Sequence, residues 1–304
     1  MDKHSKNLKK LILVCLAALL INILPVFSQP TAIDLTGVID FHAHTGPDSR
    51  PRGFNDFETV RLAEKAGLRG IVLKNHFTMT ADRAALAMTL VDNLEVFGGV
   101  ALNRAVGGIN PEAVRQLVRF DGHRGKVVWL PTFDSEFYVT RAGSGEPFVS
   151  VIENGAPVPG LIEVFSIIAE NNLVLAMGHS SPEEALQLIP LAKEQGGNHI
   201  LVTHVFGQDA TMEQMQQMAD KGAIMELDWM AVYTNVVSLD DYVSAISAIG
   251  AAHFLISSDF GQAENPDQAT GMAAFILALM EAGINQAQID TMARQNPAML
   301  LELD

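Results

Sequence analysis

Cysteine is almost absent from this 304-residue chain, since Cys15 is the only one and lies within an apolar N-terminal run. If processing removes that run, no thiol remains, which excludes disulfides and thiolate metal sites. Basic residues are also few, because 20 Lys and Arg stand against 35 Asp and Glu. A net charge of −15 repels nucleic acid and anionic membranes, and we expect neither as a partner. We expect a small-molecule substrate, and the sequence leaves open whether the chain forms a homo-oligomer.

The first 28 residues have the order of a secretory signal peptide. A basic stretch, MDKHSKNLKK, precedes the apolar LILVCLAALLINILPVF and the small, polar SQPTAID, and Val26 and Ser28 suit cleavage after Ser28. This order predicts a signal peptide over 1–28 and a periplasmic or secreted protein. The alternative is an uncleaved membrane anchor, although Asn22 and Pro25 weaken the run as a spanning helix.

From residue 33 to 304, β-rich runs alternate with helix-like runs. The strand candidates are GVIDFHAH, GIVLKNH, EVFGGVAL, KVVWLPTF, LVLAMGHS, HILVTHV, AIMELDW and HFLISSDF, which begin at residues 37, 70, 95, 126, 173, 199, 223 and 253. Eight βα units predict a single (β/α)₈ TIM barrel over 33–304. A doubly wound open sheet is the alternative, but no glycine fingerprint follows the first strand.

Capping residues indicate where the predicted helices begin. Asn55, Ser181, Thr211 and Ser238 precede four of them, and Asn265 with Pro266 is expected to open the helix after the last strand. A further C-terminal helix is expected near 286–302. The longest connection, 134–160, follows the fourth strand on the face where barrels build active sites, so we expect an active-face insertion with a small hairpin.

Seven residues with metal-binding or acid–base chemistry fall at predicted strand ends. They are His42, His44, Lys74, His76, His179, His204 and Asp259. His42 and His44 share one face of a strand, because side chains at i and i+2 point the same way. Barrel chemistry gathers at the carboxyl ends of the strands, so we expect one common site. His199 and His253 open their strands and are expected to be structural, as is His123.

Imidazole and carboxylate ligands without thiolate suit a divalent metal, with Zn most favoured and Mn or Fe possible. Such an ion lowers the pKa of bound water and generates hydroxide near neutral pH. Asp259 is expected to move the proton, and Lys74 to stabilise an oxyanion. His76, Arg50 and Arg141 are candidates for binding the substrate. Asp40 is expected to support the site from behind, whereas Asp228 could face the pocket or cap the next turn.

The pattern resembles the amidohydrolase superfamily of metal-dependent barrels. The resemblance rests on the HxH at His42 and His44, on His179, His204 and Asp259 in that order, and on NPAMLLEL from Asn296. It implies that these five residues bind metal. The LKNH of the second strand and the PDSRPRG after the HxH resemble an uncharacterised branch of that superfamily.

The chain departs from that pattern at the fourth strand. Binuclear members carry a bridging Lys or Glu at its end, whereas here the strand ends in WLPTFDSEF without a lysine. Either Lys74 replaces the bridge, or the site holds one ion and His204 orients water or substrate. One or two ions therefore remain open.

The expected activity is hydrolysis of a C–N or C–O bond in an amide, lactam, lactone or ester by metal-bound hydroxide. A metal-dependent phosphoesterase or a mononuclear decarboxylase on the same barrel is the alternative. A non-catalytic metal-binding barrel is a third interpretation, but all five ligand positions are filled.

Overall fold

The computed structural model describes residues 33–303. The signal peptide predicted over 1–28 lies outside these residues. Eight strands form one sheet, in the order β1 (Ile39–His44), β2 (Gly70–Lys74), β3 (Glu95–Ala101), β4 (Gly125–Trp129), β7 (Val174–Ala176), β8 (Ile200–Val202), β9 (Ile224–Asp228) and β10 (Phe254–Ser257). Every paired neighbour in this sheet is parallel. The eight predicted strands are all confirmed.

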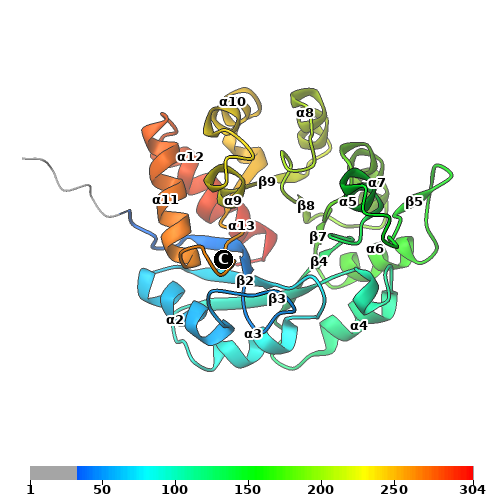
Figure 1. Ribbon diagram of the computed structural model, residues 1–304, viewed down its shortest axis with the longest axis horizontal. Helices are drawn as coiled ribbons and strands as arrows, with labels where there is room; N and C mark the ends of the chain where they lie inside the picture. The colour runs from blue at the N-terminus through cyan, green and yellow to red at the C-terminus, as the bar shows by residue number, and fades with distance from the viewer. Residues whose placement is uncertain (1–32, 304) are drawn as a thin grey trace, which may run out of the picture. The chain divides into compact units, whose positions relative to one another are not determined.

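The first strand also bonds to the segment that follows the last strand. The Asp259 amide donates to the carbonyl of His42 at 2.9 Å, and the His44 amide donates to the carbonyl of Phe260 at 2.8 Å. These bonds bring the two ends of the sheet together, so the predicted (β/α)₈ barrel is confirmed and the open doubly wound sheet is wrong. The helices that connect successive strands lie outside the ring of strands (Figure 1).

The helices that follow the strands are α2 (Asp56–Ala66), α3 (Ala81–Met88), α4 (Pro111–Arg119), α5 (Glu136–Ala142), α6 (Leu161–Glu170), α7 (Pro182–Glu194), α8 (Met212–Asp220), α9 (Trp229–Tyr233), α10 (Leu239–Ile249) and α11 (Gln268–Glu281). Short 3₁₀ turns occupy Arg104–Val106 and Ala251–His253. Among the described helices, none combines the length and the apolar content that crossing a bilayer requires.

Side-chain caps explain where most of these helices begin. Asn55, Ser181 and Thr211 form capping boxes, and the Ser238 hydroxyl accepts from the amide of Asp241. The expected start of α11 at Asn265 and Pro266 is wrong. Its cap is Asp267, whose carboxylate accepts from the backbone amide of Thr270, so the helix begins two residues after Pro266.

Segment 134–160 contains α5 and a two-stranded hairpin. The hairpin pairs β5 (Ile152–Glu153) with β6 (Ala156–Pro157) in antiparallel fashion, as the sequence predicts. Asn154 and Gly155 occupy the turn with φ of 52° and 76°, the left-handed values that tight hairpin turns require.

The C-terminal segment is helical in three consecutive parts, namely α12 (Gln286–Asp290), a π-helical turn (Thr291–Gln295) and α13 (Asn296–Leu300). The side-chain amide of Asn296 donates to the backbone carbonyls of Ala251, Ala252 and Phe254, at the start of β10. This places α13 at the amino ends of the strands.

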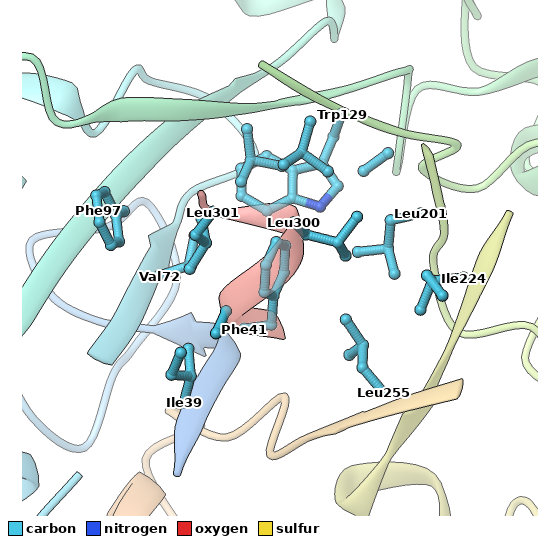
Figure 2. Packing of buried hydrophobic residues seen from close by; sticks show 14 of the residues in the cluster. Ile39, Phe41, Val72, Phe97, Trp129, Leu201, Ile224, Leu255, Leu300 and Leu301 are labelled. Atoms are coloured by element: carbon cyan, nitrogen blue, oxygen red, sulfur yellow. The ribbon is translucent and has the colours of Figure 1, made fainter. Parts of the chain in front are cut away.

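An apolar cluster fills the barrel beside α13. Leu300 and Leu301 lie within this cluster together with Phe41 and Trp129 (Figure 2). All four side chains are buried, so apolar packing occupies this part of the barrel and leaves the carboxyl ends of the strands for polar side chains.

Candidate metal centre

Three ligand atoms converge at the carboxyl ends of β1 and β10. The Nε2 atoms of His42 and His44 lie 3.3 Å apart, and Oδ1 of Asp259 lies 3.0 Å from the first and 3.1 Å from the second. Two of these residues lie two positions apart in β1, whereas Asp259 comes from the other end of the chain. The closure of the barrel therefore brings them together.

The remaining ring nitrogens of the two histidines show which tautomers are present. Nδ1 of His44 donates to the backbone carbonyl of Lys74 at 3.2 Å, because a carbonyl can only accept. Nδ1 of His42 donates to Oε1 of Glu226 at 3.0 Å. In their neutral forms both rings therefore present an Nε2 lone pair to the other ring and to the Asp259 carboxylate. Three electron pairs facing one another are unfavourable, and a cation or a proton between them removes the repulsion.

Glu226 is the site residue that the sequence reasoning missed. It lies in β9, two residues before Asp228, and the same i, i+2 rule that pairs His42 with His44 could have found it. Besides His42, it accepts from the Ser257 hydroxyl at 2.7 Å and from the His204 amide at 3.3 Å. Burial alone would raise the pKa of Glu226, but His42, together with His204 and Lys74, lowers it to about 2.

His204 lies beside this group and faces two carboxylates. Its Nδ1 is 3.6 Å from Oδ2 of Asp228 and 3.8 Å from Oδ2 of Asp259. Burial works against a charged His204, but the two carboxylates outweigh it and raise the pKa of the ring above its ordinary value. Asp228 also accepts from the Ala231 amide at 2.8 Å, so it both faces the pocket and caps α9.

His179 and His76 lie at the edge of the cluster. The His179 ring is 5.3 Å from that of His204, and its buried Nδ1 has no hydrogen-bond partner within residues 33–303. The His76 ring stacks on His44 at 4.8 Å, and its Nδ1 is hydrogen-bonded to the Thr132 hydroxyl at 2.8 Å. Burial lowers the pKa of both histidines well below the ordinary value, so both rings are neutral.

His179 is the one predicted metal ligand that the structure leaves outside the tight groups. The groups whose ligand atoms all lie within 4.8 Å of one another are His42–His44–Asp259, His42–His204–Glu226 and His204–Asp228–Asp259. Asp259 belongs to two of these groups, so its two oxygens face different histidines.

Lys74 is completely buried at the end of β2. Its Nζ lies 5.2 Å from the centre of the Trp129 ring and has no hydrogen-bond partner in the described part of the chain. Burial lowers the pKa of Lys74 to about 8, against the attraction of Asp259 and Glu226. A buried ammonium without a partner is costly. This cost indicates that Lys74 interacts with a bound ligand and not with another group of the protein.

The backbone at the site is strained. Asp259 and His204 have φ of 50° and 42°, a region that residues other than glycine seldom adopt. Asp40 anchors the segment beside Asp259, since it accepts from the amide and the hydroxyl of Ser258 at 3.0 and 2.5 Å. Burial raises the pKa of Asp40 to about 7. Asp40 therefore supports the site by holding the end of β10 in place. Among the described residues, its side chain forms no hydrogen bond to an imidazole ring.

The arginines predicted to bind substrate have different surroundings. The Arg141 guanidinium donates to the carbonyl of Gly207 at 2.9 Å and pairs with Asp209 at 3.1 Å. Arg50 instead lies 4.1 Å above the centre of the Phe133 ring, and that ring is 4.1 Å from the ring of His76.

The charges and the spacing of the donor atoms fit a divalent cation. Glu226, Asp228 and Asp259 place three carboxylates around the histidines, with Lys74 as the buried basic residue among them. Ligands bound tetrahedrally at about 2.1 Å lie about 3.4 Å from one another, close to the 3.0–3.3 Å spacing of the His42, His44 and Asp259 atoms. These three residues would hold the ion, and His204 with Asp228 could hold a second one against the other oxygen of Asp259.

The fold and the site define a class: a (β/α)₈ barrel with a histidine–carboxylate cluster at the carboxyl ends of its strands. Within that class, a model of a family of unknown function, DUF6282, matches residues 37–226. The chain belongs to this family. No curated protein matches the sequence.

Solved structures share the fold at low sequence identity. An organophosphorus hydrolase from Deinococcus radiodurans is 15% identical, with a TM-score of 0.57 over 88% of this chain and 93% of that chain. An amidohydrolase from Pseudomonas aeruginosa is 10% identical, with a TM-score of 0.62 over 88% of this chain and 96% of that chain. A protein described as engineered for organophosphate hydrolysis from a weak promiscuous lactonase template is 14% identical, with a TM-score of 0.54 over 88% and 96%. At the level of fold, the resemblance to amidohydrolase-type barrels is confirmed.

Proposed function

We propose that this protein is a metal-dependent hydrolase that cleaves a C–N or C–O bond of a small molecule. The observation that carries the proposal is the convergence of the His42 and His44 Nε2 lone pairs on the Asp259 carboxylate, within 3.3 Å. With neutral rings this arrangement places acceptor against acceptor, and a bound cation would satisfy all three atoms. Zinc suits this nitrogen and oxygen donor set best, with manganese or iron as alternatives. The proposal covers one or two ions.

When bound, a divalent cation supplies Lewis acidity, which lowers the pKa of water and polarises the bond to be cleaved. The protein's own residues then divide the remaining work. Glu226 fixes the ring of His42 through the bond to Nδ1. Asp259 has one oxygen on the His42–His44 side and another that faces His204, so it can accept a proton and pass it to the leaving group.

Lys74 and His204 interact with the negative charge that develops on the substrate during hydrolysis. Lys74 supplies a buried ammonium without a competing hydrogen bond in the described chain, which favours a role in stabilising an oxyanion. His204 carries a pKa raised by Asp228 and Asp259, so it can donate a hydrogen bond to the substrate. His179 completes the wall that the substrate meets.

The substrate class that we propose is an amide, lactam, lactone or ester. The shared fold with an amidohydrolase and with an engineered lactonase template supports this range without choosing within it. The fold is also that of an organophosphorus hydrolase, so phosphate esters belong in any test. The order of residues 1–28 supports export to the periplasm or the exterior.

The test combines metal content with turnover. We expect the purified protein to carry at least one divalent ion per chain, measured by elemental analysis. His42→Ala and Asp259→Ala should lose the ion and at least about 100-fold of the activity while their circular dichroism stays native. His199→Ala is the matched control, because His199 lies at the opposite end of a strand, just before β8. It should keep both metal and activity.

Activity is measured on a panel of amides, lactones, esters and p-nitrophenyl phosphate. Retained turnover in both His42→Ala and Asp259→Ala would remove the mechanism. A metal-free wild type whose melting temperature does not rise with Zn²⁺ or Mn²⁺ would instead indicate a non-catalytic barrel. Turnover of the phosphate ester alone would replace the proposed bond class with phosphoester hydrolysis.

A further inference from the structure

Two cavities open onto the candidate metal centre, with volumes of about 460 and about 360 Å³. Both are lined by His179, His204 and Asp259, and they extend from these shared residues along different walls. A bond cleaved at the centre would therefore have one part of the substrate in each cavity. Their linings differ in chemistry, which permits an inference about the two parts.

The larger cavity has an apolar outer wall. Met230, Ala231 and Val236 line it, together with Tyr138, whose ring lies 5.3 Å from that of His179. Val236 is 72% exposed, so its apolar side chain is open to a substrate group that enters this cavity. An apolar group of the substrate would cover it.

The basic residue of this cavity is neutralised. Arg141 lines the same space, but its guanidinium is held by Asp209 and by the carbonyl of Gly207. An anionic group entering the larger cavity would have to displace these partners. The larger cavity therefore suits a neutral, apolar substituent.

The smaller cavity contains an arginine whose charge, unlike that of Arg141, is not neutralised. Arg50 rests on the Phe133 ring, and the described residues offer it no ion pair. Arg52 lines the same cavity but is paired with Asp48 at 2.6 Å. Glu264 is the other charged residue at the outer wall, and no ion pair joins it to Arg50. Since a guanidinium stacked on a ring keeps its donors free at its edge, Arg50 is placed to bind a carboxylate or a phosphate.

We propose that the substrate is bipartite, with an apolar acyl group in the larger cavity and an anionic group bound by Arg50 in the smaller one. The bond between them lies at His179, His204 and Asp259. This inference rests on the proposed function, because it names the substrate class of the same site. The simplest chemistry of this kind is an N-acylated amino acid with an apolar acyl group and a free carboxylate.

The test compares N-benzoylglycine with N-benzoylglycinamide, which differ only by a carboxylate in place of a carboxamide. Benzoate release by the metal-loaded enzyme is measured for the wild type, Arg50→Gln and Arg61→Gln. Arg61 is an exposed arginine of α2 that lines neither cavity, and it serves as the matched control. We expect the wild type and Arg61→Gln to prefer the carboxylate by about tenfold or more in kcat/KM.

Arg50→Gln should reduce this preference to less than about threefold, through loss on the carboxylate substrate alone. Glu264→Gln, which removes the nearby negative charge, should increase the preference. Val236→Asp should instead lower the preference for N-benzoylglycine over N-acetylglycine, because it places a charge against the apolar group. A preference that survives in Arg50→Gln, or is absent from the wild type, would overturn the inference.

A second readout separates this inference from the proposed function. The same pair of compounds is titrated calorimetrically into the metal-loaded wild type and Arg50→Gln. Tighter binding of the carboxylate that depends on Arg50, without benzoate release, would support the bipartite site and contradict hydrolysis of this bond. Turnover of both compounds at equal rates would support the hydrolase and contradict the bipartite site.

Discussion

Replacing Glu226 with glutamine should weaken metal binding although Glu226 belongs to the layer behind the ligand His42. The carboxylate accepts from three donors at once, the His42 ring, the Ser257 hydroxyl and the His204 amide. Glutamine keeps the shape but offers a single acceptor oxygen, so its NH₂ must face at least one of these donors. Either orientation disturbs the position of His42 or of His204.

The size of the effect follows from the loss of a charge-assisted bond to a ligand. Such partners are worth about 10- to 100-fold in metal affinity, or about 1.4–2.7 kcal/mol. At saturating metal this loss appears in full as lost stabilisation. For a domain of this size, about 1 kcal/mol corresponds to about 2–4 °C. The zinc-induced rise in melting temperature should therefore shrink by about 3–10 °C in Glu226→Gln.

The assay is a thermal melt at several zinc concentrations, with calorimetric titration for the dissociation constant. Glu153→Gln is the matched control, because Glu153 lies exposed in the hairpin strand β5 and removes the same charge. Zinc should stabilise this control as it does the wild type. If Glu226→Gln binds zinc as tightly as the wild type, the assignment of Glu226 as the partner that positions His42 is refuted.

Two further predictions test backbone contacts, one beside the metal centre and one at the amino ends of the strands. Gly261→Ala would place a Cβ 1.9 Å from the carbonyl oxygen of His44 at a φ of 136°, so we expect about 2–6 kcal/mol of lost stability in denaturant melts. Gly283 also has a positive φ, 98°, but open space around it, so Gly283→Ala should lose only about 1–2 kcal/mol. Equal losses in the two variants would contradict the contact with His44. Asn296→Ala should cost about 1–3 kcal/mol, because the buried carbonyl of Phe254 loses its 2.6 Å donor. An unchanged denaturation midpoint would show that α13 does not depend on this bond.

Local signals were enough to predict the barrel. Each strand is a short β-rich run, and most helices begin at a capping side chain whose bond forms within three residues. Such signals act over a few residues and need no knowledge of the rest of the chain. The start of α11 escaped prediction because two residues near Pro266 could serve as the cap, and Asp267 rather than Asn265 makes the bond to Thr270.

The sequence predicted which residues belong to the candidate site better than it predicted which of them are in contact. Strand ends in a parallel barrel share one face, so His42, His44 and Asp259 could be expected together. Nothing in the order of residues says that Glu226 lies behind His42, because β9 and β1 are not neighbours in the sheet. The same holds for His179, whose distance from the tight ligand groups depends on how the chain continues beyond β7.

The sequence by itself therefore determined the repeating βα units and the side chains at the end of each strand, since both follow from alternation and from residue type. Tertiary structure alone decided which lone pairs meet and which charges stay unpaired. Arg50 and Arg141 look equivalent in the sequence, but Asp209, far along the chain, neutralises only Arg141. Pairing between distant residues depends on distances of a few ångströms, and only the closed barrel sets those distances.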